Sequence, residues 1–222
     1  MGTERQLISV TKGGWVPVPA EYRSVGAPPP SHFIHQLMKH LAHPYYVGFL
    51  SAAAIHGASH QAPMVFQVVT PARLRKRRIR RARLQFIQRT ATARRPCRIH
   101  KVPTGRIRVS TPEVTVFDLV EAPQDGAGLS NVATVVGEIL INGHLDTAAL
   151  ATVAEMYPAA VAQRVGYIVD FMADEVGVGF DTGPLQDLTV GSRYRNLLHS
   201  GGVGHHNPRW HVIVNTEIEH DL

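Results

Sequence analysis

Positive and negative charges occupy separate parts of this 222-residue sequence. Residues 1–72 contain four basic and two acidic residues, residues 73–108 contain 15 basic and no acidic residues, and residues 109–222 contain four basic and 15 acidic residues. The net charge of +6 and the pI of about 9.8 therefore describe neither part. A chain with a positive segment and a negative half favours two different partners, or one partner plus internal pairing, over a single basic binding face.

The composition predicts one sizeable folded domain, or a domain with a small appendage. Hydrophobic residues make up 44% and charged residues 18%, which excludes an expanded disordered chain. The longest apolar run, Tyr45–Ile55, is too short to cross a bilayer, and no signal peptide opens the chain. A lone cysteine, Cys97, cannot form an internal disulfide, which is typical of a reducing compartment. We therefore expect a cytoplasmic protein without a membrane anchor.

The first 30 residues predict a small separate element. Residues 6–19 read as two short strands turned by Gly13-Gly14, because paired glycines accept the positive φ angles of a tight turn. A stiff Gly-Ala-Pro-Pro-Pro connector follows at residues 26–30. We therefore expect a division into an N-terminal β-hairpin, residues 1–27, and a main domain, residues 28–222.

The main domain is expected to be α+β, with helices packed on a small mixed or antiparallel sheet. Strands are predicted at residues 64–70, around Leu84 and Phe86, at 98–102 and 106–109, and at 209–215. Helices are predicted from Ser31, from Pro44 to about Gly57, and after Thr111, Asn131, Asp146 and Pro158. Ser31, Thr111 and Asp146 are expected to cap their helices. Residues 177–208 are rich in glycine and polar residues, which favours a long, partly irregular segment.

A dense basic run is the strongest binding signal. Between residues 73 and 83, eight of eleven residues are basic, and the planar guanidinium fork suits phosphate oxygens. We therefore predict nucleic-acid contacts from Lys12 in the hairpin turn and from Arg73, Arg75, Lys76, Arg77, Arg78, Arg80, Arg81 and Arg83. The alternative is a solvated strand face that the acidic half partly neutralises. Phe86 is the only ring near the run, so base stacking is not indicated there.

Catalytic and metal-binding patterns are weak in this sequence. No Gly-x-Ser-x-Gly elbow occurs, and nothing identifies a base to pair with Cys97. His56 and His60 have helical spacing, but Gly57 separates them and no glutamate follows His56. Six acids on predicted helices are expected on solvated faces: Asp118, Glu121, Glu138, Asp170, Asp174 and Glu175. We therefore expect no catalytic residue, no metal and no cofactor. Among the functions considered, a nuclease has the least support.

Several segments, taken in order, resemble the AbiEi family of antitoxins. They are residues 44–57 (PYYVGFLSAAAIHG), 66–69 (FQVV), a basic β region, 110–120 (STPEVTVFDLV), 128–133 (GLSNVA), 162–167 (AQRVGY) and 210–215 (WHVIVN). Together they cover most of residues 7–217, and the ordered set is more specific than any single motif.

The resemblance implies a bacterial antitoxin that neutralises a nucleotidyltransferase toxin and often represses its own operon. Family members typically join an N-terminal winged-helix DNA-binding domain to a larger domain for antitoxicity. Here residues 6–19 match only the wing hairpin, so we expect most of the winged-helix domain to be missing. The resemblance thus implies toxin neutralisation, with a DNA-binding transcriptional autorepressor as the alternative. The acidic half is expected to face the positive surface of an RNA-acting toxin.

Overall fold

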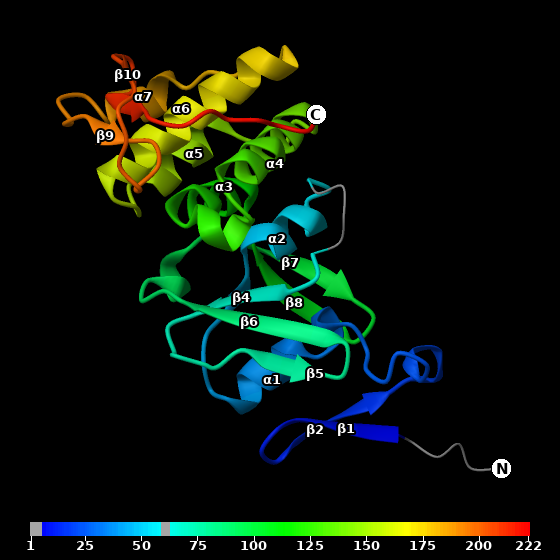
Figure 1. Ribbon diagram of the computed structural model, residues 1–222. Coiled ribbons are helices and arrows are strands. Elements are labelled where there is room, and N and C mark those ends of the chain that lie inside the picture. Colours follow the sequence, from blue (N-terminus) through cyan, green and yellow to red (C-terminus); the bar gives the residue numbers. More distant parts are fainter. Residues whose placement is uncertain (1–5, 59–62) are drawn as a thin grey trace. The chain divides into compact units, whose positions relative to one another are not determined.

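The computed structural model describes residues 6–58 and 63–222, and it divides into two compact units (Figure 1). The first unit comprises residues 1–51 and 62–110, and the second comprises residues 52–61 and 111–222. The first unit holds 19 basic and two acidic residues, a net charge of +17, and the second holds four basic and 15 acidic residues, a net charge of −11. The units therefore follow the division of charge. The expected division at residues 27/28 stays a prediction.

A six-stranded mixed sheet forms the centre of the first unit. In spatial order its strands are β5 (Arg77–Ile79), β6 (Ala82–Gln88), β4 (Phe66–Thr70), β3 (Tyr46–Val47), β8 (Gly105–Ser110) and β7 (Cys97–Val102). The pairs β4/β6 and β3/β8 are parallel, and the others are antiparallel. Apolar residues of α1 (Ile34–His40) are buried, and α1 contacts β8. This confirms the α+β class.

The predicted N-terminal hairpin is present. Strands β1 (Gln6–Thr11) and β2 (Gly14–Val18) pair antiparallel, and Gly13 has the positive φ of +77° that the turn requires. The strands form a sheet of their own. The guanidinium of Arg77 donates a hydrogen bond of 2.6 Å to the Val10 carbonyl, which ties β5 to this hairpin.

The helix predicted from Pro44 is wrong in its first turn. Tyr46 and Val47 form strand β3, and α2 (Phe49–Ile55) begins only afterwards. Tyr46 pairs with Val69, and Val47 pairs with Val109, so two distant strands take up backbone groups that a helix would otherwise use. The Ser31 cap is also wrong, because Ser31 lies in a 3₁₀ turn and α1 starts after Phe33.

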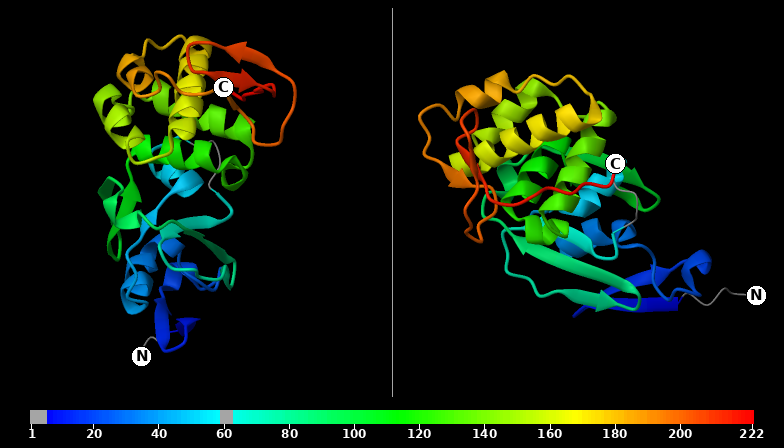
Figure 2. Two further views of the ribbon diagram at one scale, coloured as in Figure 1. Left: turned by 90° about the vertical axis from the view of Figure 1, so that its left-hand side faces the viewer. Right: turned by 45° about the horizontal axis from the view of Figure 1, so that its top comes forward.

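Helices dominate the second unit (Figure 2). They are α3 (Pro112–Glu121), α4 (Leu129–Ile141), α5 (Thr147–Ala154), α6 (Ala159–Val176) and α7 (Gly183–Asp187). The caps act as predicted: the Thr111 hydroxyl accepts a hydrogen bond from the Val114 amide, and the Asp146 carboxylate accepts one from the Ala149 amide. Helices α4 and α6 pack along each other through buried stripes that include Val136 and Met172.

A three-stranded sheet follows the helices, in the order β10 (His205–Asn207), β11 (Val212–Val214) and β9 (Arg195–Asn196). The segment 177–208, expected to be partly irregular, contains α7 and two short strands. None of the described helices is both long and apolar enough to span a membrane.

Candidate nucleic-acid interface

The predicted basic run folds into the loop before β5 and the β5–β6 hairpin, at one edge of the six-stranded sheet (Figure 1). Arg78 lies directly opposite Arg83, so both side chains share one face. Ile79 and Leu84 point to the other face, where they are buried at 7% and 1% exposure. The alternation that buries the apolar residues therefore places the arginines in solvent.

Most of the predicted contact residues are free to bind an anion. All eight cations of the run are exposed except Arg77, which is half-buried and bonded to Val10, and Lys12 is exposed at the hairpin turn. The Arg78 guanidinium donates to the Arg80 carbonyl at 3.3 Å. Within the described residues, no carboxylate forms an ion pair with any of these nine side chains. Within its own unit the run is therefore a solvated strand edge whose exposed cations can meet a bound anion.

A surface groove of about 330 Å³ runs along the hairpin. Four cations line it together with Val65, Leu84 and Gln85, and one of them, Arg77, is already bonded to Val10: Lys76, Arg77, Arg78 and Arg83. The three remaining cations surround one depression, so they can contact successive phosphate groups of a single backbone. No ring lines the groove, so its chemistry favours a phosphate backbone over unpaired bases.

A second basic edge was not singled out in the sequence. On β7 and β8, Lys101 lies directly opposite Arg106, and both are exposed. Following the paired residues across the sheet puts this pair on the same face as Arg78 and Arg83. Buried Tyr46 and Val69 lie between the two pairs on that face. The cations therefore form two separate groups at opposite edges.

Replacing Arg83 by glutamine is expected to stabilise the isolated protein by about 0.2–1 kcal/mol, because like charges directly opposite on paired strands repel each other. The same change should weaken nucleic-acid binding. Urea unfolding and a binding titration on one preparation would test both effects. Arg94→Gln is the matched control, since Arg94 is exposed and lies outside any strand pair. A loss of stability in Arg83→Gln equal to that of the control would contradict this prediction.

The acids of the second unit divide into buried and exposed sets. Asp118 and Glu138 are buried at 0% and 8% exposure, so their expected solvated role is wrong. The Tyr157 hydroxyl donates a 2.8 Å hydrogen bond to Asp118, which offsets the cost of burying the carboxylate. Nine carboxylates are exposed: Asp146, Glu155, Asp174, Glu175, Asp181, Asp187, Glu217, Glu219 and Asp221.

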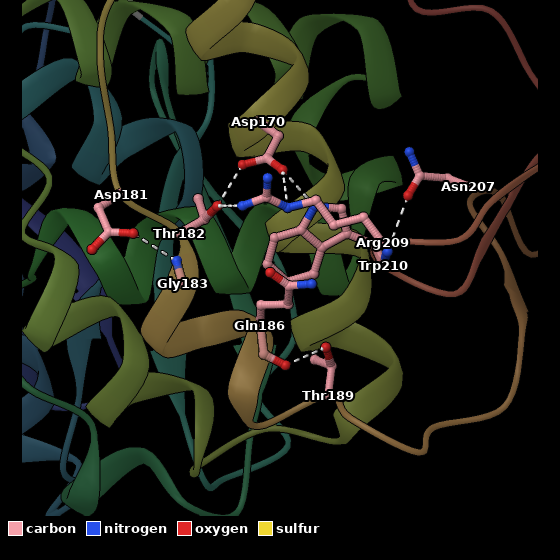
Figure 3. A network of polar contacts seen from close by, with 9 residues as sticks. All are labelled: Asp170, Asp181, Thr182, Gly183, Gln186, Thr189, Asn207, Arg209 and Trp210. Atoms are coloured by element: carbon pink, nitrogen blue, oxygen red, sulfur yellow. Dashed lines mark hydrogen bonds and ion pairs between the residues drawn. The ribbon is translucent and has the colours of Figure 1, made fainter.

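A polar network fixes Arg209 and Trp210 to α6 (Figure 3). Asp170 accepts hydrogen bonds from the Trp210 indole at 2.7 Å and the Thr182 hydroxyl at 2.6 Å, and it forms a 3.0 Å ion pair with Arg209. The Arg209 guanidinium also donates a 2.8 Å hydrogen bond to the Thr182 hydroxyl, so the contacts of this network lie within the second unit and stabilise it. Among the described residues, no group of three histidine, cysteine or acidic side chains is placed to hold a metal ion.

Comparison with solved structures supports the fold. The crystal structure of the RV2827C protein from Mycobacterium tuberculosis matches with a TM-score of 0.61 and 13% sequence identity, over 93% of this chain and 74% of that chain. At this identity the likeness shows the fold alone. No curated protein gave a match to the sequence.

The family comparison covers the sheet and the helices together. The model of the AbiEi antitoxin C-terminal domain matches residues 46–171, which run from β3 into α6 and make up more than half of the chain. The matched part includes the basic hairpin and most of the helices of the acidic unit. The chain therefore belongs to the AbiEi antitoxin family.

Proposed function

We propose that this chain neutralises a nucleotidyltransferase toxin by binding it directly, in the cytoplasm, without chemistry of its own. Membership of an antitoxin family supports a role in a toxin–antitoxin system. The observation that best supports direct binding is the charge of the second unit, which is −11 with nine exposed carboxylates. An enzyme that acts on RNA needs a positive surface, and a negative surface of this size would steer association with it and cover the RNA site.

Four exposed acids can be replaced to test this proposal: Glu155, Asp174, Asp187 and Glu217. Their side chains make no contact in the described part of the chain, so their replacement should leave the fold intact. Replacing all four by their amides should lower the association rate with the toxin by about tenfold or more at low ionic strength. Growth rescue on co-expression should weaken in parallel. Rate measurements at two salt concentrations would separate steering from contact loss.

A matched control raises the net charge by the same four units in the first unit, through lysine at Ser24, Met64, Thr90 and Ala93, which are all exposed. This variant should leave rescue unchanged if the acidic unit meets the toxin. Full rescue by the four-amide variant at every toxin level would reject steering by the acidic unit. A failure of the unaltered chain to rescue growth would reject toxin neutralisation itself.

A second candidate, transcriptional repression of its own operon, is favoured by the unpaired cations of the β5–β6 hairpin and Lys12. It requires binding to duplex DNA with a preference for one sequence. Phosphate contacts alone carry no sequence information, so this hairpin would supply affinity and not selectivity. A comparison of operator and scrambled duplexes distinguishes a repressor from a general polyanion binder.

A further inference from the structure

The last residues of the chain, 216–222, form a strap that crosses the helices of the second unit (Figure 2). Two backbone amides of the strap bond to α4. The Glu219 amide donates a 3.3 Å hydrogen bond to the Ser130 hydroxyl, and the Asp221 amide donates one of 3.2 Å to the Thr134 hydroxyl. Ser130 and Thr134 lie one helical turn apart, so the strap follows α4 with its backbone in a fixed place.

A stripe of α6 lies beside the strap. Tyr167, Phe171 and Glu175 follow one another at intervals of four residues, which puts them on one side of the helix. The rings of Tyr167 and Phe171 are nearly parallel, with centroids 6.3 Å apart and an interplanar angle of 16°. From the strap, the His220 imidazole lies 3.2 Å from the Glu175 carboxylate and meets the Phe171 ring edge-on. The strap is therefore bonded to both helices.

The small sheet supplies a third side. His205 on β10 is paired directly with Val214 on β11, so both side chains point to the same face of the sheet. Val212, two positions before Val214 and therefore on that face too, is 0% exposed, and β11 contacts α6. The face that carries His205 and Val214 is thus the one turned to α6.

A cavity of about 350 Å³, called here the strap cavity, opens between these three segments. Two rings of α6, two residues of the small sheet and four residues of the strap line it: Tyr167, Phe171, His205, Val214, Thr216, Glu217, Ile218 and Glu219. Among the described residues, no lysine or arginine lines it. A site of this size is at the lower end of the range for small ligands, about 300–1,000 Å³, and admits one side chain of a partner.

The two carboxylates of the strap cavity are available to a ligand. Glu217 and Glu219 are exposed, and in the described chain neither carboxylate takes part in a hydrogen bond or an ion pair. They belong to a unit with a net charge of −11. A bound cation would reduce the repulsion among these charges, whereas a bound anion would increase it.

Aromatic faces together with carboxylates are suited to one kind of cation. The negative face of an aromatic ring attracts a cation placed over it, and a carboxylate accepts charge-assisted hydrogen bonds. A guanidinium group does both at once, because it is planar, stacks on rings and presents a fork of N–H donors to a carboxylate. Arginine therefore fits the strap cavity better than the compact ammonium group of lysine.

We propose that the strap cavity receives an arginine side chain of the toxin, with its guanidinium over the two rings and bonded to the two carboxylates. The inference rests on the proposed function and names the place on the acidic unit where the toxin docks. Steering by the acidic surface acts on the association rate. A seated side chain acts on the dissociation rate, because the contact exists only in the formed complex.

A peptide titration tests the strap cavity without the toxin. The probe is acetyl-Gly-Arg-Gly-amide, and its control carries citrulline, which has the shape of arginine without the charge. In NMR titrations of the full chain, the arginine peptide should bind about fivefold or more tighter than the citrulline peptide. Tyr167→Leu and Glu219→Gln should each weaken it by about threefold. Asp221→Asn removes the same charge from the same strap outside the lining and should change it little.

Dissociation from the toxin tests the partner. The double variant Tyr167→Leu/Glu219→Gln should dissociate about tenfold faster and associate within about twofold of the unaltered rate. Its control is Tyr194→Leu/Asp221→Asn, which changes two exposed residues of the same unit outside the strap cavity, and thermal melting shows whether both variants are folded.

The outcomes separate this inference from the proposed function. Neither variant contains an acid of the four-amide set, so the two tests are independent. Equal dissociation rates for the double variant and its control, or equal binding of the arginine and citrulline peptides, would overturn the strap cavity alone. An unaltered chain that does not bind the toxin would overturn the proposed function and, with it, the identity of the partner.

Discussion

Trp210→Ala is expected to lower the free energy of unfolding of the second unit by about 3–5 kcal/mol, the range found for truncating a fully buried aromatic residue. Trp210 is 0% exposed, and its ring covers Gly166 so closely that a Cβ at that glycine would lie 2.2–2.4 Å from three ring carbons. Alanine would leave a cavity over α6 and would remove the indole donor from Asp170 (Figure 3). Urea unfolding followed by circular dichroism measures the loss.

Two variants separate packing from the hydrogen bond. Trp210→Phe fills most of the space but removes the N–H that donates to Asp170, so its loss should lie between zero and that of alanine. Gly166→Ala places a methyl group in the ring and should cost about 1–3 kcal/mol with Trp210 intact. Trp15→Ala is the matched control, because Trp15 is 62% exposed and should cost little. Equal losses at Trp15 and Trp210 would show that burial does not decide the effect.

Local signals in the sequence placed the elements whose ends depend on nearby residues. The hairpin at Gly13, the strand pair turned near Gly105 and the helix starts at Thr111 and Asp146 all rest on contacts within a few positions, and they are confirmed. Strand β3 was missed because its pairs, Val69 and Val109, lie far along the chain. Period and propensity carry no information on such pairing.

The same distinction applies to the sites. The basic run could be recognised from eight cations in eleven residues, and its exposed placement follows from the alternation of Ile79 and Leu84 with arginines. The strap cavity could not, because only the path of the last residues brings Glu217 and Glu219 to the rings of α6. That path depends on the hydroxyls of Ser130 and Thr134, which lie 89 and 87 positions before the amides that bond to them.

Neutralising four cations of the β5–β6 edge is expected to abolish most binding to duplex DNA. The variant changes Lys76, Arg78, Arg81 and Arg83 to glutamine, all of which are exposed and free of carboxylates in the described chain. If each meets one phosphate, the slope of log affinity against log salt should fall in magnitude by about 3.6, because each phosphate contact contributes about 0.9. Affinity at moderate salt should drop by about a hundredfold. Fluorescence polarisation across a salt series measures both quantities.

The other edge of the sheet and the turn before β7 supply a matched control that removes the same charge. Arg94, Arg98, Lys101 and Arg106 are also exposed, and glutamine at all four lowers the net charge equally. If the groove along β5 and β6 holds the phosphates, this variant should change the slope by less than about 1, since it alters only the long-range field. Equal slopes in the two variants would mean that the net charge of +17 on this unit, and not the hairpin, determines the affinity. The slopes of the two variants can also be compared on operator and scrambled duplexes. If they differ by the same amount on both, the hairpin contacts only the DNA backbone. The autorepressor would then lack a source of sequence preference in this hairpin.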